Sequence, residues 1–172
     1  IMKNKSVTIV GNIKNHYRFY ITICEVFKTE LVTLNCTEEV YEAINEIGYA
    51  NKINFNILRR EDLYKNFTIG DLNIIEQPYI FKDLLGLAFK SYMPNIFIIC
   101  HNGNSWFFPW RTRHSSFKLK NFRSVFLKEI IKRRTNNFIL VSTKVEDYLS
   151  KHIGEKNFYT IPFDMILAPE DT

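Results

Sequence analysis

The stretch NIFIIC, residues 95 to 100, is followed directly by His101. The five residues from Ile96 to Cys100 are all apolar, which is typical of a strand that is buried on both faces of a sheet. Such strands occur mainly in parallel sheets whose two faces are covered by helices. The stretch therefore predicts an interior strand of an α/β protein, with a histidine at the carboxyl end of that strand.

Similar strands recur along the chain, and helical segments separate them. Apolar and β-branched runs predict seven strands, at residues 6–12, 30–35, 53–59, 71–78, 95–100, 138–143 and 158–163. Amphipathic spacing predicts helices at residues 16–28, 38–47, 79–92, 122–134 and 144–153, with a shorter helical turn at 61–67. Parallel strands need crossovers, and right-handed crossovers place helices on the sheet. We therefore predict a doubly wound α/β domain with a mostly parallel, Rossmann-like sheet and helices on both faces.

Composition favours a single folded domain. The chain has 172 residues, of which 46% are hydrophobic and 15% aromatic. We expect residues 1–164 to form this domain and residues 165–172 to begin a linker or tail. The three cysteines are widely spaced in apolar stretches, which indicates core residues in a reducing compartment. No apolar run reaches the ~20 residues of a membrane span, and the start of the chain does not resemble a signal peptide, so we expect a cytoplasmic location.

Positive charge is concentrated in one part of the chain. Residues 102–136 hold nine of the 23 Lys and Arg but a single acidic residue. This window begins with an expected loop, 102–121, which is much longer than the usual connection of about 2–6 residues. Long loops of this kind tend to bind ligands, and this one mixes aromatic and basic residues, which suits a membrane boundary or stacking on sugars or bases. Its candidate binding residues are Trp106, Trp110, Arg111 and Arg113.

Ligands of open α/β sheets bind beyond the carboxyl ends of the strands. His101 lies there and is the candidate catalytic residue, as a general base, an orienting donor or a phosphate partner; alternatively, its ring only bonds a nearby carbonyl. Glu76 either binds a substrate hydroxyl or, as we expect, caps the following helix. The other candidate substrate-binding residues at strand ends are Gly11, Asn12, Asn102, Gly103 and Ser142. We find no GxGxxG, P-loop or G-x-S-x-G motif, and no His, Cys, Asp and Glu group with metal-site spacing.

The order of these pieces resembles the amino-terminal domain of GT-B glycosyltransferases, the hexosyltransferases of lipid-linked glycans and capsular polysaccharides. The resemblance rests on IFIICHN at 96–102, a long loop and a helix, then NNFILVSTKVEDYLSKH at 136–152 and KNFYTIPF at 156–163. It covers about residues 5 to 164. One departure is that the family commonly has a glycine pair in its first loop, whereas Gly11 is followed by Asn12.

The resemblance implies a function and a set of partners. In this family the first domain binds the acceptor, the second binds the nucleotide-sugar, and reaction takes place in the cleft between them, usually without an essential metal. His101 matches the cleft histidine near the transferred sugar, and Ser142 matches the serine after the next strand. We expect the acceptor-binding half of a hexosyltransferase for surface polysaccharide synthesis, acting on a glycan or lipid-linked acceptor, with no cofactor besides the donor substrate.

The resemblance also implies that a donor-binding domain belongs to the same or a separate chain, so that residues 1–172 alone are inactive. A lipid-linked acceptor implies contact with an anionic membrane surface, with the protein peripheral to it. We do not expect a nucleic-acid partner. Two alternatives remain: a non-enzymatic α/β module that uses the basic aromatic loop to bind a partner or nucleic acid, and a small α/β enzyme that uses His101 with Glu76.

Overall fold

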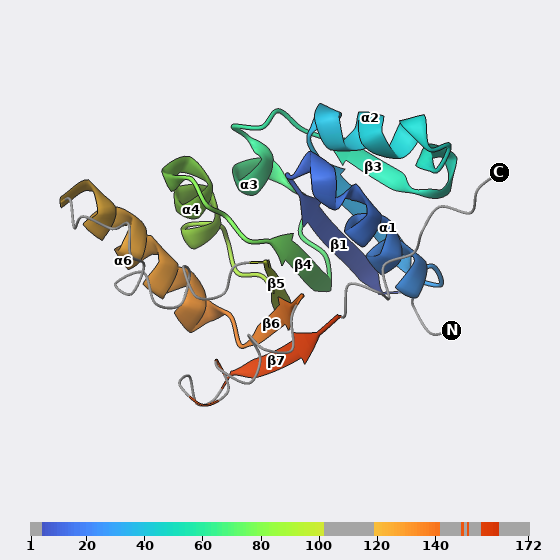
Figure 1. Ribbon diagram of the computed structural model, residues 1–172. Coiled ribbons are helices and arrows are strands. Elements are labelled where there is room, and N and C mark those ends of the chain that lie inside the picture. Colours follow the sequence, from blue (N-terminus) through green and yellow to red (C-terminus); the bar gives the residue numbers. More distant parts are fainter. Residues whose placement is uncertain (1–4, 102–118, 142–148, 150, 152–155, 162–172) are drawn as a thin grey trace.

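The computed structural model describes residues 5–101, 119–141, 149, 151 and 156–161, except for the side chains of residues 119–121. Within these residues the chain alternates between strands and helices (Figure 1). The strands are β1 (Ser6–Gly11), β2 (Leu31–Cys36), β3 (Asn54–Ile57), β4 (Leu72–Glu76), β5 (Ile96–Cys100), β6 (Asn137–Leu140) and β7 (Asn157–Thr160). The α-helices are α1 (Tyr17–Val26), α2 (Glu38–Glu46), α3 (Leu63–Asn66), α4 (Phe81–Ala88) and α6 (Leu119–Arg134). Two 3-10 helices, η1 (Lys14–His16) and η2 (Ala50–Lys52), lie in loops.

The seven strands form one parallel sheet in the order β3-β2-β1-β4-β5-β6-β7. This arrangement confirms the predicted doubly wound α/β fold and all seven predicted strands. The chain proceeds in one direction from β1 to β3 and then returns to the other side of β1, where β4 pairs with it. Strand order therefore reverses between β1 and β4, and their carboxyl ends flank the crevice where such sheets bind ligands.

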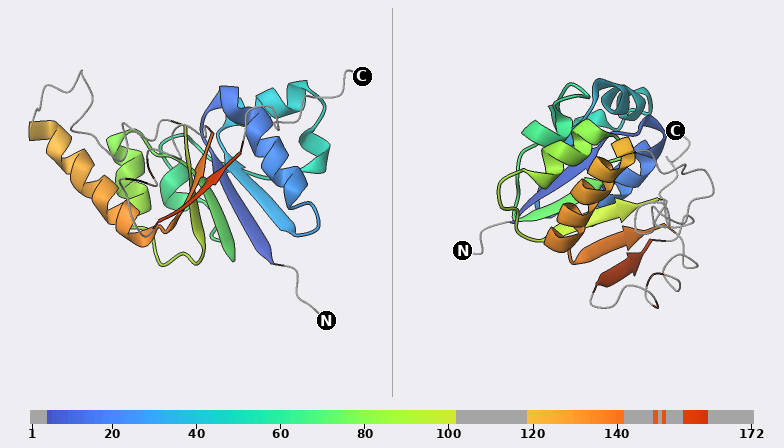
Figure 2. Two further views of the ribbon diagram at one scale, coloured as in Figure 1. Left: turned by 60° about the horizontal axis from the view of Figure 1, so that its bottom comes forward. Right: turned by 90° about the vertical axis from the view of Figure 1, so that its left-hand side faces the viewer.

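Two hydrophobic clusters cover opposite faces of the sheet. Neighbouring residues on β1 point in opposite directions, so that Ile9 joins the cluster under α1 and α2 while Val10 joins the cluster under α3, α4 and α6. Ile74 and Ile75 on β4 divide in the same way. The two helical layers can be followed in Figure 2. This double coverage explains why the interior strands are rich in apolar residues, continuously so in β5.

The helix predicted at residues 79–92 is shorter than its periodicity indicated. Ile80 is still extended, and α4 runs only from Phe81 to Ala88. After the helix the chain turns into β5, and Asn95, the residue before that strand, has a positive φ of 45°. The Asn95 side chain holds this turn by donating a hydrogen bond to the Asp71 carbonyl at 3.0 Å. None of the helices described here is both long and apolar enough to cross a bilayer.

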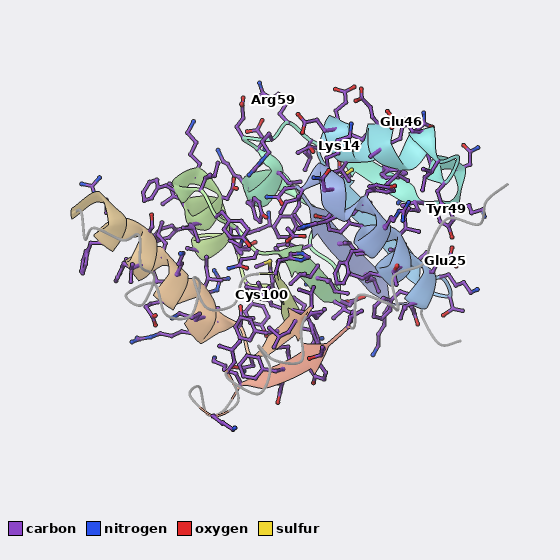
Figure 3. All side chains as sticks on the ribbon, in the orientation of Figure 1. Lys14, Glu25, Glu46, Tyr49, Arg59 and Cys100 are labelled. Carbon is purple, nitrogen blue, oxygen red and sulfur yellow. The ribbon has the colours of Figure 1, made fainter. Side chains whose placement is uncertain are left out.

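Cys24, Cys36 and Cys100 are free thiols in the interior, as expected for core residues. In Figure 3, Cys100 lies at the sheet, whereas Arg59 and Glu46 lie at the periphery. Burial raises the pKa of Cys24 and of Cys36 to about 12, and it also raises the pKa of Cys100. A thiol with such a pKa is inert because the thiolate is the reactive form.

We predict that the native chain does not react with a disulfide reagent such as DTNB at about pH 8. With a pKa near 12, only about one thiol in ten thousand is ionised at that pH. In denaturant all three thiols should react at the rate of a free cysteine. The control is Asn51→Cys, which places one thiol on the exposed surface and should react in the native chain. Rapid native reaction of the unsubstituted chain would contradict the burial of these residues.

Candidate functional site

Three titratable side chains meet at the carboxyl edge of the sheet, beside the point where strand order reverses. His16 ends η1, in the turn between β1 and α1. Glu76 is the last residue of β4, and His101 follows β5 directly. All parallel strands end at the same edge, and Glu76 lies opposite Ile99 in the register of β4 and β5. The fold therefore brings together residues from three distant segments.

Glu76 is the centre of the group because each carboxylate oxygen faces a different histidine. Oε1 lies 3.0 Å from Nε2 of His101, and Oε2 lies 3.5 Å from Nδ1 of His16. The side chain of Glu76 is fully buried, whereas 25% of the His16 side chain and 16% of the His101 side chain are exposed. The histidines thus separate the carboxylate from solvent, and both can be reached by a ligand.

The two imidazole rings stack on one another, with centroids 3.8 Å apart and planes inclined by 31°. The edge of the His101 ring also packs near Phe19, at a centroid distance of 5.8 Å. The two rings therefore pack against each other beside the Glu76 carboxylate.

Two tyrosines hold Glu76 in place. The Tyr20 hydroxyl, on the first turn of α1, donates a 2.7 Å hydrogen bond to Oε2 of Glu76 and accepts one from the backbone N–H of Ile13 at 3.3 Å. The Tyr64 hydroxyl donates to the backbone carbonyl of Glu76 at 2.8 Å. Both tyrosines are buried. Tyr20 therefore fixes the carboxylate, and Tyr64, on the opposite face of the sheet, fixes the backbone of the same residue.

Burial alone would raise the pKa of Glu76, because a low-dielectric environment disfavours the charged carboxylate. The contacts with His101 and His16 and the hydrogen bond from Tyr20 outweigh this effect, so that the pKa is lowered from its ordinary value. Burial and the nearby Glu76 charge raise the pKa of Tyr20 well above its usual range. At neutral pH the site therefore contains an ionised carboxylate that accepts a hydrogen bond from a neutral phenol.

Gly11 and Asn12, the predicted residues at the end of β1, lie at the same edge. A Cβ atom on Gly11 would lie 2.6 Å from Cε2 of Tyr20, so the absence of a side chain makes room for the Tyr20 ring. Oδ1 of Asn12 is buried and has no hydrogen-bond partner among the described residues. Gly11 thus supports the site indirectly, while Asn12 offers an acceptor to a ligand.

Of the remaining candidate site residues, the structure describes Glu76 and His101. The structure brings Glu76 and His101 into contact, as the position of both residues at strand ends predicted. The expectation that Glu76 caps the next helix is wrong, because the residue at that cap position is Ile80. The other candidates lie outside the described residues and stay predictions: Asn102, Gly103, Trp106, Trp110, Arg111, Arg113 and Ser142.

Sequence reasoning missed His16 and Tyr20. His16 lies four residues beyond Asn12, the last candidate at the end of the first strand, and it is the first residue of the helix predicted at 16–28. One signal was available: His16 and Tyr20 are four residues apart, a spacing that places both on one face of a helix starting at this edge of the sheet. Spacing in sequence does not relate either residue to Glu76.

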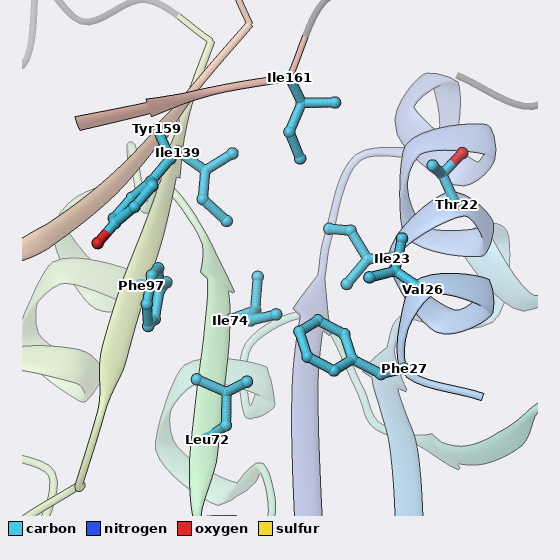
Figure 4. Close-up of a pocket in the computed structure, with 10 residues that line it drawn as sticks. All are labelled: Thr22, Ile23, Val26, Phe27, Leu72, Ile74, Phe97, Ile139, Tyr159 and Ile161. Carbon is cyan, nitrogen blue, oxygen red and sulfur yellow. The ribbon is translucent and has the colours of Figure 1, made fainter. Parts of the chain in front are cut away.

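A second feature is an apolar groove between α1 and the sheet, with a volume of about 400 Å³ (Figure 4). It is bordered by Thr22, Ile23, Val26 and Phe27 of α1 and by side chains of the strands, namely Leu72, Ile74, Phe97, Ile139, Tyr159 and the neighbouring Ile161. The polar side-chain groups among these bordering residues are the hydroxyls of Thr22 and Tyr159. These residues include no acid or histidine, so the histidine–glutamate group is the better candidate for a reactive site.

Comparison with known proteins assigns no function to this geometry. No family model, no curated protein and no solved structure matched the chain. The function is therefore inferred from the candidate site and from the sequence resemblance.

We predict that Gly11→Ala destabilises the chain by about 1–3 kcal/mol, as expected when a methyl group is forced into a packed interior. The added Cβ would collide with the buried ring of Tyr20, which cannot easily move because its hydroxyl is bonded to Glu76. Urea unfolding followed by circular dichroism measures the change. In a Tyr20→Leu background the same substitution should cost much less. An equal cost in both backgrounds would contradict the proposed collision.

Proposed function

We propose that this chain is the acceptor-side domain of a glycosyltransferase. In this proposal it binds a glycan or lipid-linked acceptor, to which a hexose is transferred from a nucleotide-sugar. The single observation that carries the proposal is the contact between His101 and the buried, ionised Glu76 at the carboxyl edge of β4 and β5. This is the place where open parallel sheets bind ligands, and the sequence around His101 resembles the corresponding segment of GT-B enzymes.

In this proposal His101 is the base that takes a proton from the acceptor hydroxyl. In the neutral ring that carries its proton on Nε2, the atom 3.0 Å from Oε1 of Glu76, the lone pair of the imidazole lies on Nδ1. As the acceptor oxygen forms a bond with the anomeric carbon, its proton passes to Nδ1, and the nucleotide leaves with the electron pair of the broken bond. The ionised Glu76 stabilises the imidazolium that results, because an adjacent negative charge favours the protonated ring.

Neighbouring groups have roles that suit an acceptor. Oδ1 of Asn12 can accept a hydrogen bond from a second sugar hydroxyl. Tyr20 and Tyr64 keep Glu76 fixed, so that His101 needs little reorganisation when the acceptor binds. The donor would be bound mainly by another domain, in the same or a separate chain.

We predict that the chain binds surface-polysaccharide oligosaccharides on a glycan array and does not consume nucleotide-sugars by itself. His101→Ala should weaken binding of the selected glycan about two- to tenfold, since a hydrogen bond between neutral groups contributes about 0.5–1.5 kcal/mol. These measurements use EDTA to remove metal ions. The control is Lys28→Ala, a substitution at an exposed position that should leave glycan binding unchanged. Binding of no glycan, or equal binding by the His101 variant, would contradict the proposal.

Membrane contact is a separate part of the proposal. The predicted contact residues Trp106, Trp110, Arg111 and Arg113 lie outside the described residues, so the argument rests on the composition of that loop. Each basic residue near an anionic surface contributes about 1 kcal/mol, and tryptophan favours the interface. Replacing these four residues by Ala or Ser should abolish pelleting with phosphatidylglycerol liposomes, while His101→Ala should pellet normally. Equal pelleting of the native and four-residue variants would contradict this part.

A second candidate function is an α/β enzyme that acts without a partner domain. The contact between His101 and Glu76 favours it, because a base oriented by a carboxylate serves many proton-transfer reactions. This candidate differs from the first in one outcome: the isolated chain would turn over a substrate, and His101→Ala would abolish that turnover. Transfer or hydrolysis of a nucleotide-sugar by residues 1–172 alone would therefore favour the second candidate.

A further inference from the structure

The Glu76 carboxylate is buried, and no lysine or arginine of the described residues pairs with it. Among the described residues its ion-pair partners are His16 and His101. An ionised group in the interior is costly unless positive charge or several hydrogen bonds compensate it. Protonation of one histidine is one way to supply that charge. A bound metal ion is another, and several features of the group favour it.

The first feature is the mutual orientation of His101 and Glu76. Nε2 and Oε1 are 3.0 Å apart, yet neither atom has a hydrogen-bond partner in the described part of the chain, since the ring N–H direction does not point at the oxygen. Two buried acceptor atoms that are close but not bonded to each other can share a third partner. A cation between them would accept both lone pairs.

The second feature is the donor set. One ligand atom from each of His16, Glu76 and His101 lies within 4.8 Å of the other two. Ligands about 2.0–2.1 Å from a tetrahedral zinc ion are somewhat closer to one another than this, so small side-chain shifts would complete the site. Two imidazole nitrogens with one carboxylate oxygen are typical ligands of first-row transition metals, whereas Mg²⁺ and Ca²⁺ prefer oxygen.

The third feature is the surroundings of the three ligands. Oε2 of Glu76 accepts the hydrogen bond from Tyr20, an outer contact of the kind that orients a metal-binding carboxylate. Both histidine side chains are partly exposed, which gives a metal ion a way in and leaves a position for water. The ring stack is compatible with two neutral imidazole ligands.

From these features we propose that His16, Glu76 and His101 bind a divalent first-row transition-metal ion of the Zn²⁺ class. This inference goes beyond the proposed function and does not depend on it. Metal binding uses the Nε2 lone pair of His101, whereas the base described above needs a proton on that atom. The metal-bound and acceptor-bound forms therefore exclude one another, and a metal ion would act as an inhibitor of the transfer reaction.

The test is a titration of the metal-free full chain, residues 1–172, with Zn²⁺ alone by calorimetry and with Co²⁺ alone by visible absorption. We expect one ion per chain and the d–d absorption of Co²⁺ bound in a tetrahedral or five-coordinate site. His16→Gln and Glu76→Gln should each weaken Zn²⁺ binding at least about a hundredfold, since each removes a direct ligand. Tyr20→Phe removes only an outer contact, and such changes typically cost about 10–100-fold.

Two matched controls are His114→Gln and His152→Gln, at the histidines outside the described residues. Both should bind Zn²⁺ like the native chain. A further measurement needs no variant and guards against misfolding: Co²⁺ should selectively shift or broaden the imidazole NMR signals of His16 and His101. The proposal is overturned by absence of Zn²⁺ binding, by binding that survives His16→Gln and Glu76→Gln, or by binding lost in a control variant. Failure of the metal proposal would not affect the glycan-binding result, because glycan binding is measured in EDTA, which removes metal ions.

Discussion

The buried carboxylate of Glu76 is the constraint on which the candidate site depends. A charge in the interior must be compensated locally, and here the compensation comes from Tyr20 and the two stacked histidines. Gly11 is required because the Tyr20 ring occupies the space of its side chain. The positions of α1, β1, β4 and β5 are thus tied together by one side chain, and a change at any of these contacts leaves a charge uncompensated.

The fold was predictable because the signals that specify it are local. An interior strand of a parallel sheet is buried on both faces, so β5 reads as a continuous apolar run, and β1 and β4 contain more apolar residues than the alternating pattern of a half-exposed strand. Once strands and helices alternate, the right-handed crossover rule leaves few topologies. The residues at which each helix begins and ends were harder to predict. Helix α4 is shorter than its apolar spacing suggested because the chain on either side of it is needed to join the strands.

The site was only half predictable. Glu76 and His101 follow strands directly, and the common carboxyl edge of a parallel sheet brings such residues together regardless of their distance in sequence. His16 and Tyr20 lie one turn farther along the chain, where their distance from the edge depends on how η1 and α1 are oriented. The spacing of residues in the sequence does not predict this orientation. Sequence spacing does not indicate the proposed metal ligands for the same reason, because His16, Glu76 and His101 come from separate segments.

The strand order has a consequence for the way in which this protein folds. β1 pairs with β2, the next strand in the chain, and also with β4. In sequence, β2, β3 and the helices around them lie between β1 and β4. Closing so long a loop costs chain entropy, and the hydrogen bonds and packing between β1 and β4 offset that cost only once they have formed. Contacts between β1 and β4 therefore form late in folding. The hydrogen bond from Tyr20 to Glu76 depends on this pairing. Partly folded chains therefore lack the contacts of the candidate site, which form only when β4 joins β1 in the sheet.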